Sequence, residues 1–465
     1  MTKHFLPDRM PLMSGLKLPL PGQNKTLRPL LKVAVPVMLA NGAETVYNLT
    51  DSWFLGRLGP AELSAPSIAF NFIMLIILAG QGIAAAGTTL ISRAVGQKNR
   101  EKAEFFLGQV AGLLVSSAVV LAVLGWFLTV PFLKVLQTPD ELFAMTASYM
   151  RIICAGVPFM YGFFIMQSAM EGTGNTMAAL RIQLLATAVN IPLDGFLIFG
   201  IGPVPALGVE GAALATVISR MIAAVLGIII LLKGRQGIRL RLKNTRYHRE
   251  TMGLLIRVAV PSSLSQMGSS LGFAVLHSII NSFGTTVIAA FGVVNRIQAL
   301  FYMPVQGLAR GTTTLVGQSL GAGENDRTGS VVRTAVHMSL IYIIPGMVFC
   351  FFYGSLFIRF FIDDPAVVAE GASLFRINSA SVIVFAVFMI LAGAFQGAGD
   401  TRSLMYMHLG RLWVLRLPLA WLAAYALGMG PKGVWYAMAV SNLMITIIGI
   451  YRFRSGRWVY ALKAL

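Results

Sequence analysis

The sequence predicts an all-α integral membrane protein, with twelve transmembrane helices in two homologous six-helix lobes around a central cavity. Three observations lead to this fold class. The 465 residues are 56% hydrophobic and only 12% charged, with a mean hydropathy of +0.74, which is not the composition of a water-soluble globular protein. Long apolar runs recur along the chain, and three short motifs return at one constant spacing.

The apolar runs set the number of helices. Each is about 20 residues long, which suffices to cross a hydrocarbon core about 30 Å thick as an α-helix. An even number of spans also places both termini on the same side of the membrane. The expected helix centres lie near residues 43, 77, 115, 155, 188, 220, 268, 300, 340, 383, 415 and 442.

An internal repeat divides these helices into two sets. LLKVAVP at 30–36 returns as LLIRVAVP, QGIAAAGTT at 81–89 as QGLARGTTT, and EGTGNT at 171–176 as QGAGDT, each ending 225 residues further on. Such repeats indicate two homologous halves. Because each half holds six helices, both have the same orientation, and parallel repeats of this kind are typical of membrane transporters.

The repeat and the loops give the domain boundaries. The first 26 residues lack the apolar core of a cleavable signal peptide and are expected to be a tail. In order, we expect a flexible cytoplasmic tail, a first lobe, a basic cytoplasmic linker, a second lobe and a second cytoplasmic tail, at 1–26, 27–232, 233–252, 253–455 and 456–465.

The net charge of +19 comes from basic residues in alternate loops, which argues against nucleic-acid binding. The linker alone carries seven Lys and Arg residues between 233 and 250, against one acid, Glu250. By the positive-inside rule, these loops and both termini lie in the cytoplasm. We therefore expect a multi-pass protein of the cell inner membrane. The expected partners are the lipid bilayer and small organic molecules, and the protein is expected to be a monomer.

Three acidic side chains lie within the apolar runs, all in the first half: Glu44, Asp51 and Asp194. An ionisable group at membrane depth is costly unless it faces a cavity or a partner, so by default it marks an ion or substrate pathway. The fold itself does not need these acids, because the matching residues of the second half are neutral, namely Ser269, Leu276 and Ala420.

Helical geometry brings the acids together. Glu44, Tyr47 and Asp51 are spaced i, i+3, i+7 and share one face of the first helix. Asn190 and Asp194 are four residues apart and share a face of the fifth helix. Both aspartates come late in spans that run outward from the cytoplasm, so we expect them at a similar depth in a shared pocket.

Two carboxyl groups in a low-dielectric pocket cannot both ionise at low cost, so one is expected to exchange protons near physiological pH. Alternatively, Asp51, Asp194 and Asn190 form a metal site if the ion is Na⁺. A structural role, with Asp51 at a helix end and Asp194 satisfied in the core, stays open. Two prolines, Pro36 and Pro192, each remove a backbone donor inside a helix and favour a kink or hinge.

These motifs resemble those of the MATE (multidrug and toxic compound extrusion) family. The resemblance rests on the first-span pattern Pro36-x14-Asp51, on the fifth-span pattern Asn190-x3-Asp194, and on GTT…GQ…G segments that close the second and eighth spans. It extends over residues 27–455. Within the family, the sequence looks closest to the DinF-like branch.

The resemblance implies a secondary active multidrug efflux antiporter, which exports cationic or amphipathic organic compounds in exchange for H⁺ or Na⁺ by alternating access. It implies a bend of the first helix at Pro36 and no cofactor besides the coupling ion. An enzyme is not expected, because HExxH and GxxxxGK[ST] motifs are absent from the sequence. The cation-coupling site that it implies consists of Tyr47, Asp51, Asn190, Asp194 and Thr216.

A lipid-linked precursor flippase of the same superfamily is the alternative function, since it would share the two-lobe plan. Arg296 and Arg416 keep it open, because they either pair with carbonyl groups or face the cavity, whereas Arg411 is expected to snorkel from a helix end. With one extra residue in the second half, Asn190 matches Arg416. Flexible methionine thioethers suit varied apolar ligands. The expected cavity residues are Glu44, Met166, Gln266, Met267, His277, Arg296, Met303 and Arg416.

Overall fold

The computed structural model describes residues 26–200, 205–234 and 236–462, and every regular element within these ranges is helical. The predicted tail at 1–26 lies outside them except for Thr26, as do the last three residues of the second predicted tail. The six helices of the first half are α1 (Leu27–Leu58), α2 (Pro60–Gly96), α3 (Arg100–Val135), α4 (Asp140–Thr173), α5 (Thr176–Phe199) and α6 (Gly208–Lys233).

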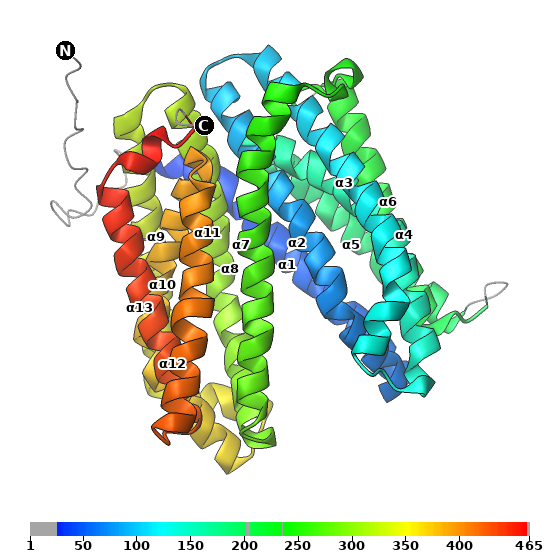
Figure 1. Ribbon diagram of the computed structural model, residues 1–465, viewed down its shortest axis with the longest axis vertical. Coiled ribbons are helices and arrows are strands. Elements are labelled where there is room, and N and C mark those ends of the chain that lie inside the picture. Colours follow the sequence, from blue (N-terminus) through cyan, green and yellow to red (C-terminus); the bar gives the residue numbers. More distant parts are fainter. Residues whose placement is uncertain (1–25, 201–204, 235, 463–465) are drawn as a thin grey trace. The chain divides into compact units, whose positions relative to one another are not determined.

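The second half has the same number of helices (Figure 1). All twelve predicted centres fall within the twelve helices, so the predicted all-α fold is confirmed. One helix, over 401–426, is segmented into α11 (Thr401–Leu409), a π-helical stretch (Gly410–Arg416), α12 (Leu417–Trp421) and a second π-helical stretch (Leu422–Ala426). The others are α7 (Arg249–Asn281), α8 (Thr285–Gly321), α9 (Asn325–Phe361), α10 (Pro365–Ala398) and α13 (Pro431–Arg454).

Nine helices in the described part of the chain are long and apolar enough to cross a membrane. The other three are polar or interrupted. α1 contains Glu44 and Asp51, α7 contains Arg257, and the segmented helix contains Arg411 and Arg416 as well as its π-helical stretches. The helix content and the nine apolar spans together describe a multi-pass membrane protein.

The repeated EGTGNT and QGAGDT motifs are turns that end a helix. Gly174 and Gly399 follow α4 and α10 with φ of 80° and 81°, in the left-handed region that favours glycine. Their N–H groups donate to the carbonyl oxygens of Glu171 and Gln396, which closes the last helical turn. The same glycine is therefore needed at the same place in both halves.

The described chain divides into two compact units. One unit is Pro36–Ser263, and the other joins residues 264–462 to residues 26–35. Helices α1 and α7 therefore each contribute residues to both units. In the first unit α4 packs against α2, α3 and α6, and in the second α10 packs against α8, α9 and α13. The fourth helix of each half is thus the central helix of its unit.

Small residues let α8 and α10 approach closely in the second unit. A Cβ atom at Gly393 would overlap the carbonyl oxygen of Ala309, and one at Gly397 would overlap that of Thr313. The Thr313 hydroxyl donates a 2.9 Å hydrogen bond to the Gly393 carbonyl. Small residues four apart are the usual means of close helix packing in membranes. Gly172, which matches Gly397, likewise leaves no room for a side chain toward α2.

The basic linker is folded against α3 in the first unit. The buried Gln109 donates from Nε2 to the carbonyl oxygens of Asn244 and Arg246, at 2.7 Å each. Arg241 forms an ion pair of 2.7 Å with Glu104, which is 1% exposed. Buried side-chain groups of α3 therefore bind the linker backbone and one of its charges.

The extra residue of the second half has a place in the segmented helix. Its counterpart α5 is a continuous α-helix, whereas the 401–426 helix contains two π-helical stretches. A π turn closes through an i→i+5 hydrogen bond and so holds one residue more than an α turn. The helix can accept an insertion in this way without ending.

Candidate functional site

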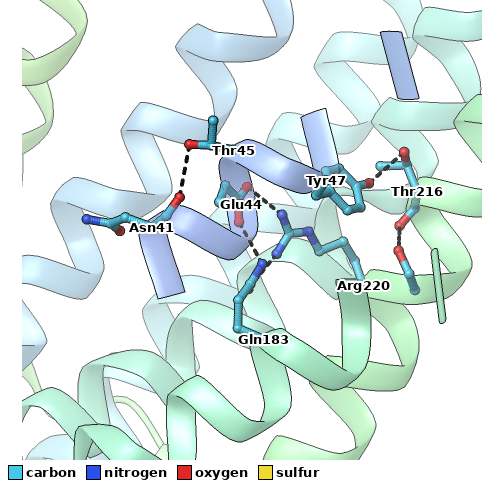
Figure 2. Close-up of polar contacts among 8 residues, drawn as sticks. Asn41, Glu44, Thr45, Tyr47, Gln183, Thr216 and Arg220 are labelled. Atoms are coloured by element: carbon cyan, nitrogen blue, oxygen red, sulfur yellow. Dashed lines mark hydrogen bonds and ion pairs between the residues drawn. The ribbon is translucent and has the colours of Figure 1, made fainter. Parts of the chain in front are cut away.

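Helix α1 carries three of the predicted site residues on one continuous α-helical stretch, as their spacing requires. Tyr47 is 5% exposed, while Glu44 and Asp51 are partly exposed. Figure 2 shows Glu44 and Tyr47 with their polar partners. All of the contacts described next lie within the first compact unit.

The two predicted aspartates come together between α1 and α5. Asp194 and Asn190 are both 0% exposed, and the Asn190 amide donates to Asp194 Oδ1 at 3.4 Å. Asp51 lies close enough to Asp194 for the two carboxyl groups to interact electrostatically. The buried Tyr149 of α4 interacts with both. The two carboxyl groups thus lie near one another, and their role as a shared coupling site stays a prediction.

The residues around these two aspartates carry oxygen atoms that have no hydrogen-bond partner in the described part of the chain. They belong to Asp51 (Oδ1), Asp194 (Oδ2), Asn190 (Oδ1) and Thr187 (Oγ1), and each atom is buried. Buried polar atoms are satisfied in the large majority of cases, so four together need an explanation. Oxygen acceptors without donors suit a proton or a hard cation. Thr187 lies three residues before Asn190 and seven before Asp194, on the same face of α5.

Tyr47 joins this region to α6. Its hydroxyl donates a 2.7 Å hydrogen bond to Thr216 Oγ1 (Figure 2). Thr216 in turn accepts, through its carbonyl oxygen, a hydrogen bond from Ser219. The structure therefore connects the two residues that the sequence analysis placed in one network, Tyr47 and Thr216.

Glu44 belongs to a group of three charged and polar side chains (Figure 2). Arg220 of α6 donates to Glu44 Oε1 at 2.6 Å and to Gln183 Oε1 at 3.1 Å. Gln183 of α5 donates to Glu44 Oε2 at 2.8 Å. The Glu44 side chain is 44% exposed and that of Arg220 only 12%. The guanidinium also lies 5.2 Å from the Tyr47 ring centre.

Arg220, Gln183, Thr187 and Tyr149 were not found by sequence reasoning. A signal existed for Arg220, because a cation inside the sixth apolar run is as costly as the acids that were singled out. No periodicity marks the other three as functional, since a buried Gln, Thr or Tyr is common in a helix interface.

The remaining predicted cavity residues belong to both compact units. Met166 is 0% exposed and packs against Gly227 in the first unit. In the second unit, Gln266, Met267 and Met303 are half-buried, and Arg296 is exposed. His277 is exposed and its ring lies 5.1 Å from that of the buried Phe291. Their role as cavity residues stays a prediction.

The expectation that Arg411 snorkels is wrong. Arg411 and Arg416 are only 4% and 2% exposed. Both guanidinium groups donate to Asn442 Oδ1 of α13, at 3.1 Å and 2.5 Å. Their side chains turn inward because Asn442, Ser441 and the Met438 carbonyl oxygen of α13 offer polar partners inside the unit.

Metal ligands of the usual kind are not grouped in the described residues: no three His, Cys, Asp or Glu side chains are placed to hold an ion together. The candidate cation site therefore consists of two carboxyl groups with an amide and a hydroxyl.

The chain is similar to known proteins over most of its length. The family model MatE matches it twice, over residues 36–196 and 261–422. The two matches begin 225 residues apart, in agreement with the internal repeat. The chain is 28% identical over 427 residues to "Probable multidrug resistance protein YoeA" of Bacillus subtilis (strain 168), which covers 90% of this chain and 92% of that protein.

Two further similarities cover the same length. The chain is 27% identical over 425 residues to "FAD transporter" of Shewanella oneidensis, covering 91% of this chain and 93% of that protein. The solved structure described as MATE in the bent conformation has a TM-score of 0.87 at 22% identity, and the match covers 95% of this chain and 97% of that one. This last similarity concerns the fold.

Proposed function

The chain belongs to the MatE family of membrane transporters, and from this we propose that it is a secondary active multidrug efflux transporter that exchanges small organic compounds for a cation. The similarity to a probable multidrug resistance protein supports the substrate class. One observation carries the coupling part of the proposal. It is the group of four buried oxygen atoms without partners around Asp51 and Asp194.

The coupling ion binds at this group. Protonation of either carboxyl group gives it an O–H donor, which a neighbouring orphan oxygen can accept. Na⁺ instead takes the carboxylate, amide and hydroxyl oxygens as ligands. In both cases a buried negative charge is neutralised. This is favourable because a charge without a partner is costly to bury in a low-dielectric environment. Asp51, Asp194, Asn190, Tyr47 and Thr216 form the site, with H⁺ as the first expectation for a DinF-like protein.

Ion binding acts on α1 through Pro36. The two compact units meet in the chain between Val35 and Pro36, and Pro36 cannot donate the backbone hydrogen bond that would stiffen the helix. Neutralising Asp51, which lies on the same helix, changes the relative stability of the straight and bent forms of α1. The ion can drive transport only because it binds these forms unequally.

Glu44 is the residue of the first lobe best suited to a cationic substrate. Its side chain is 44% exposed although the carboxylate pairs with Arg220. The relatives whose names mention multidrug resistance or FAD transport do not favour the flippase alternative. We place both termini in the cytoplasm, and we take residues 27–232 and 253–455 as the two lobes and 233–252 as their linker.

The proposal is tested by reconstituting the protein in liposomes and measuring efflux of a fluorescent cationic dye. Efflux driven by a pH gradient is compared with efflux driven by a Na⁺ gradient. We expect Asp51→Asn and Asp194→Asn to abolish ion-driven efflux while the protein stays folded. The control is Asp140→Asn, which removes an exposed acid at the start of α4 and should leave efflux unchanged.

Two results would count against the proposal. Unchanged efflux in both Asp51→Asn and Asp194→Asn would overturn the assignment of the coupling site. If efflux by the unsubstituted protein responds to neither gradient, ion exchange itself is overturned and the flippase alternative is favoured.

A further inference from the structure

The second unit contains two buried cations, and both lie in a helix that the sequence predicts to cross the membrane. Arg411 and Arg416 lie in the middle third of the segmented helix 401–426 and are at least 96% and 98% buried. A charge near the centre of a bilayer is costly unless it meets a partner. Such a partner would normally be a carboxylate, since guanidinium and carboxylate match in charge and shape.

No carboxylate meets them in the described part of the chain. The partners of Arg416 are Ser441 Oγ at 2.9 Å, Asn442 Oδ1 at 2.5 Å and the Met438 carbonyl oxygen at 3.5 Å. Arg411 donates to the same Asn442 oxygen at 3.1 Å. All of these acceptors are neutral, and the charged or phenolic groups that interact with Arg416 are Arg411 and Tyr302. No acidic side chain among the described residues therefore balances the charge of the pair.

The two guanidinium groups also have more donors than acceptors. Two arginines carry ten N–H donors, whereas the four hydrogen bonds above use three acceptor groups. Arg411 Nε is buried and has no acceptor among residues 26–200, 205–234 and 236–462. Donors that are left over inside a membrane protein point to a ligand rich in acceptor oxygens.

The π-helical stretch is what brings the two arginines together. Positions five apart on an α-helix point about 140° away from each other, because each residue turns the helix by about 100°. In a π-helix residues i and i+5 are joined by a hydrogen bond and lie near one face. Arg411 and Arg416 are five apart within the stretch Gly410–Arg416. An ordinary α-helix would not let both reach Asn442.

Aromatic rings surround the pair. The Arg411 guanidinium lies 4.3 Å from the Phe385 ring centre, and Phe273 lies 6.0 Å from Arg411 and 5.8 Å from Arg416. Phe273 is 37% exposed, so a ring beside the guanidinium groups reaches the surface of its unit.

The repeat makes the contrast with the first lobe explicit. Arg416 occupies the position that matches Asn190, and Ala420 the position that matches Asp194. One helix therefore presents oxygen atoms without donors, and its counterpart presents two guanidinium groups of which one N–H, at Arg411 Nε, has no acceptor among the described residues. The first arrangement suits a cation and the second suits an anion.

We propose that Arg411 and Arg416, with Asn442, form a binding site in the second lobe for the anionic group of an aromatic small molecule, either a phosphate or a carboxylate. The guanidinium groups bind the anionic oxygens and the rings of Phe273 and Phe385 pack against the aromatic part. The inference rests on the proposed export of small organic molecules and extends their class to anionic and zwitterionic aromatic compounds.

Equilibrium binding to purified protein in phosphatidylcholine nanodiscs tests the site without any ion gradient. The probe is 4-methylumbelliferyl phosphate, and the matched probe without the anion is 4-methylumbelliferone. We expect only the phosphate to bind, and Arg416→Met to raise its Kd roughly tenfold or more, as the loss of a charge-assisted hydrogen bond does. Arg416→Lys keeps the positive charge but not the planar, forked guanidinium group. Its Kd for the phosphate probe should therefore fall between those of the unsubstituted protein and Arg416→Met. Arg402→Met, an exposed cation of α11, should bind as the unsubstituted protein does.

Asn442→Asp provides a second test that does not depend on deleting a cation. The new carboxylate takes the place of the amide that both guanidinium groups already contact, so it supplies an internal anion. We expect a higher melting temperature and loss of phosphate binding. Equal binding in Asn442→Asp and unsubstituted protein, or equal binding of both probes, would overturn the site. Loss of phosphate binding in nanodiscs that contain phosphatidylglycerol would assign the site to a lipid headgroup and overturn the small-molecule ligand.

The result of this binding test can be distinguished from the result of the efflux test of the proposed function. Asp51→Asn lies in the other unit and is expected to keep the same Kd for the phosphate probe even though it abolishes ion-driven efflux. Dye efflux without phosphate binding would sink only the anion site, and phosphate binding without ion-driven efflux would sink only the exchange mechanism.

Discussion

Arg220 of α6 and Glu44 of α1 form an ion pair of 2.6 Å, and Gln183 of α5 donates to the second oxygen of the same carboxylate. This relationship explains an acid that has no counterpart in the second half. Glu44 compensates a cation that is 88% buried, and in return it is held in one orientation with part of its surface exposed. The pair therefore joins three helices of the first unit through charge.

Removing one member of this pair should cost stability. Arg220→Met leaves Glu44 partly exposed to solvent, whereas Glu44→Gln leaves Arg220 charged and mostly buried without its anion. We expect Glu44→Gln to be the more damaging of the two changes. It should lower the free energy of unfolding by about 1–3 kcal/mol, between the range for a surface pair and that for a buried pair. Thermal unfolding of the two single variants measures the difference.

The double variant supplies the control for this pair. If the ion pair is responsible, Glu44→Gln combined with Arg220→Met should lose less stability than the two single changes added together. Strict additivity would show that the two side chains act independently and would contradict the pairing.

Binding of a cationic dye should weaken in Glu44→Gln, because this partly exposed side chain loses its negative charge.

The hydrogen bond between Tyr47 and Thr216 predicts a second paired effect. Tyr47→Phe removes the hydroxyl and leaves the Thr216 oxygen without its donor, which should cost about 1 kcal/mol. Thr216→Val removes the acceptor and should cost about the same. Ion-driven efflux should fall in both, and the double variant should be no worse than either single one. Efflux at the level of the unsubstituted protein in Tyr47→Phe would exclude the hydrogen bond from the coupling network.

Much of the fold follows from periodic signals in the sequence. Apolar runs, the 225-residue repeat and the i, i+3, i+7 spacing of Glu44, Tyr47 and Asp51 depend on helix geometry alone, and the structure has the helices where these signals place them. The partners of these residues on other helices do not follow. Whether Glu44 meets Gln183 and Arg220, or Tyr47 meets Thr216, depends on the rotation of one helix against another.

The segmented helix shows the same limit from another side. The repeat reveals one extra residue near Pro418, but it does not say whether a loop, a kink or a π turn accommodates it. Only the structure shows that π turns accommodate the extra residue and that they bring Arg411 beside Arg416. This is why Arg411 was expected to snorkel and is instead buried.

The packing of α8 on α10 predicts a strong effect of small substitutions. Gly397→Val places a branched side chain against the Thr313 carbonyl oxygen, where even a Cβ atom would overlap. Because this obstacle is backbone and cannot rotate away, we expect a loss of about 2–3 kcal/mol, near the upper end of overpacking effects. Melting temperature measures it. The matched change Gly410→Val, where nothing lies within 4 Å of the added Cβ, should be much milder.

The binding of the linker by α3 predicts that Gln109 is a structural residue. Gln109→Ala leaves the carbonyl oxygens of Asn244 and Arg246 and the N–H of His248 without this partner. At about 1 kcal/mol for each hydrogen bond, we expect a loss of about 2–3 kcal/mol and faster proteolysis within 233–250. Gln97→Ala, which removes only an exposed 3.4 Å contact with Lys102, is the control. Equal protease resistance in the two variants would contradict the role of Gln109.

The last prediction concerns Thr187, whose buried hydroxyl has no partner and which faces the same way as Asn190 and Asp194. If this oxygen takes part in binding the coupling ion, Thr187→Val should weaken ion-driven efflux while changing side-chain volume little, and Thr187→Ser should restore it. The dependence on ion concentration should shift, since a lost ligand lowers affinity rather than the maximal rate. A Val variant with normal ion dependence would mean that the hydroxyl is merely buried. A variant in which efflux falls at every ion concentration by the same factor would indicate a packing defect on α5 instead, because an ion ligand can be overcome by more ion and a packing defect cannot.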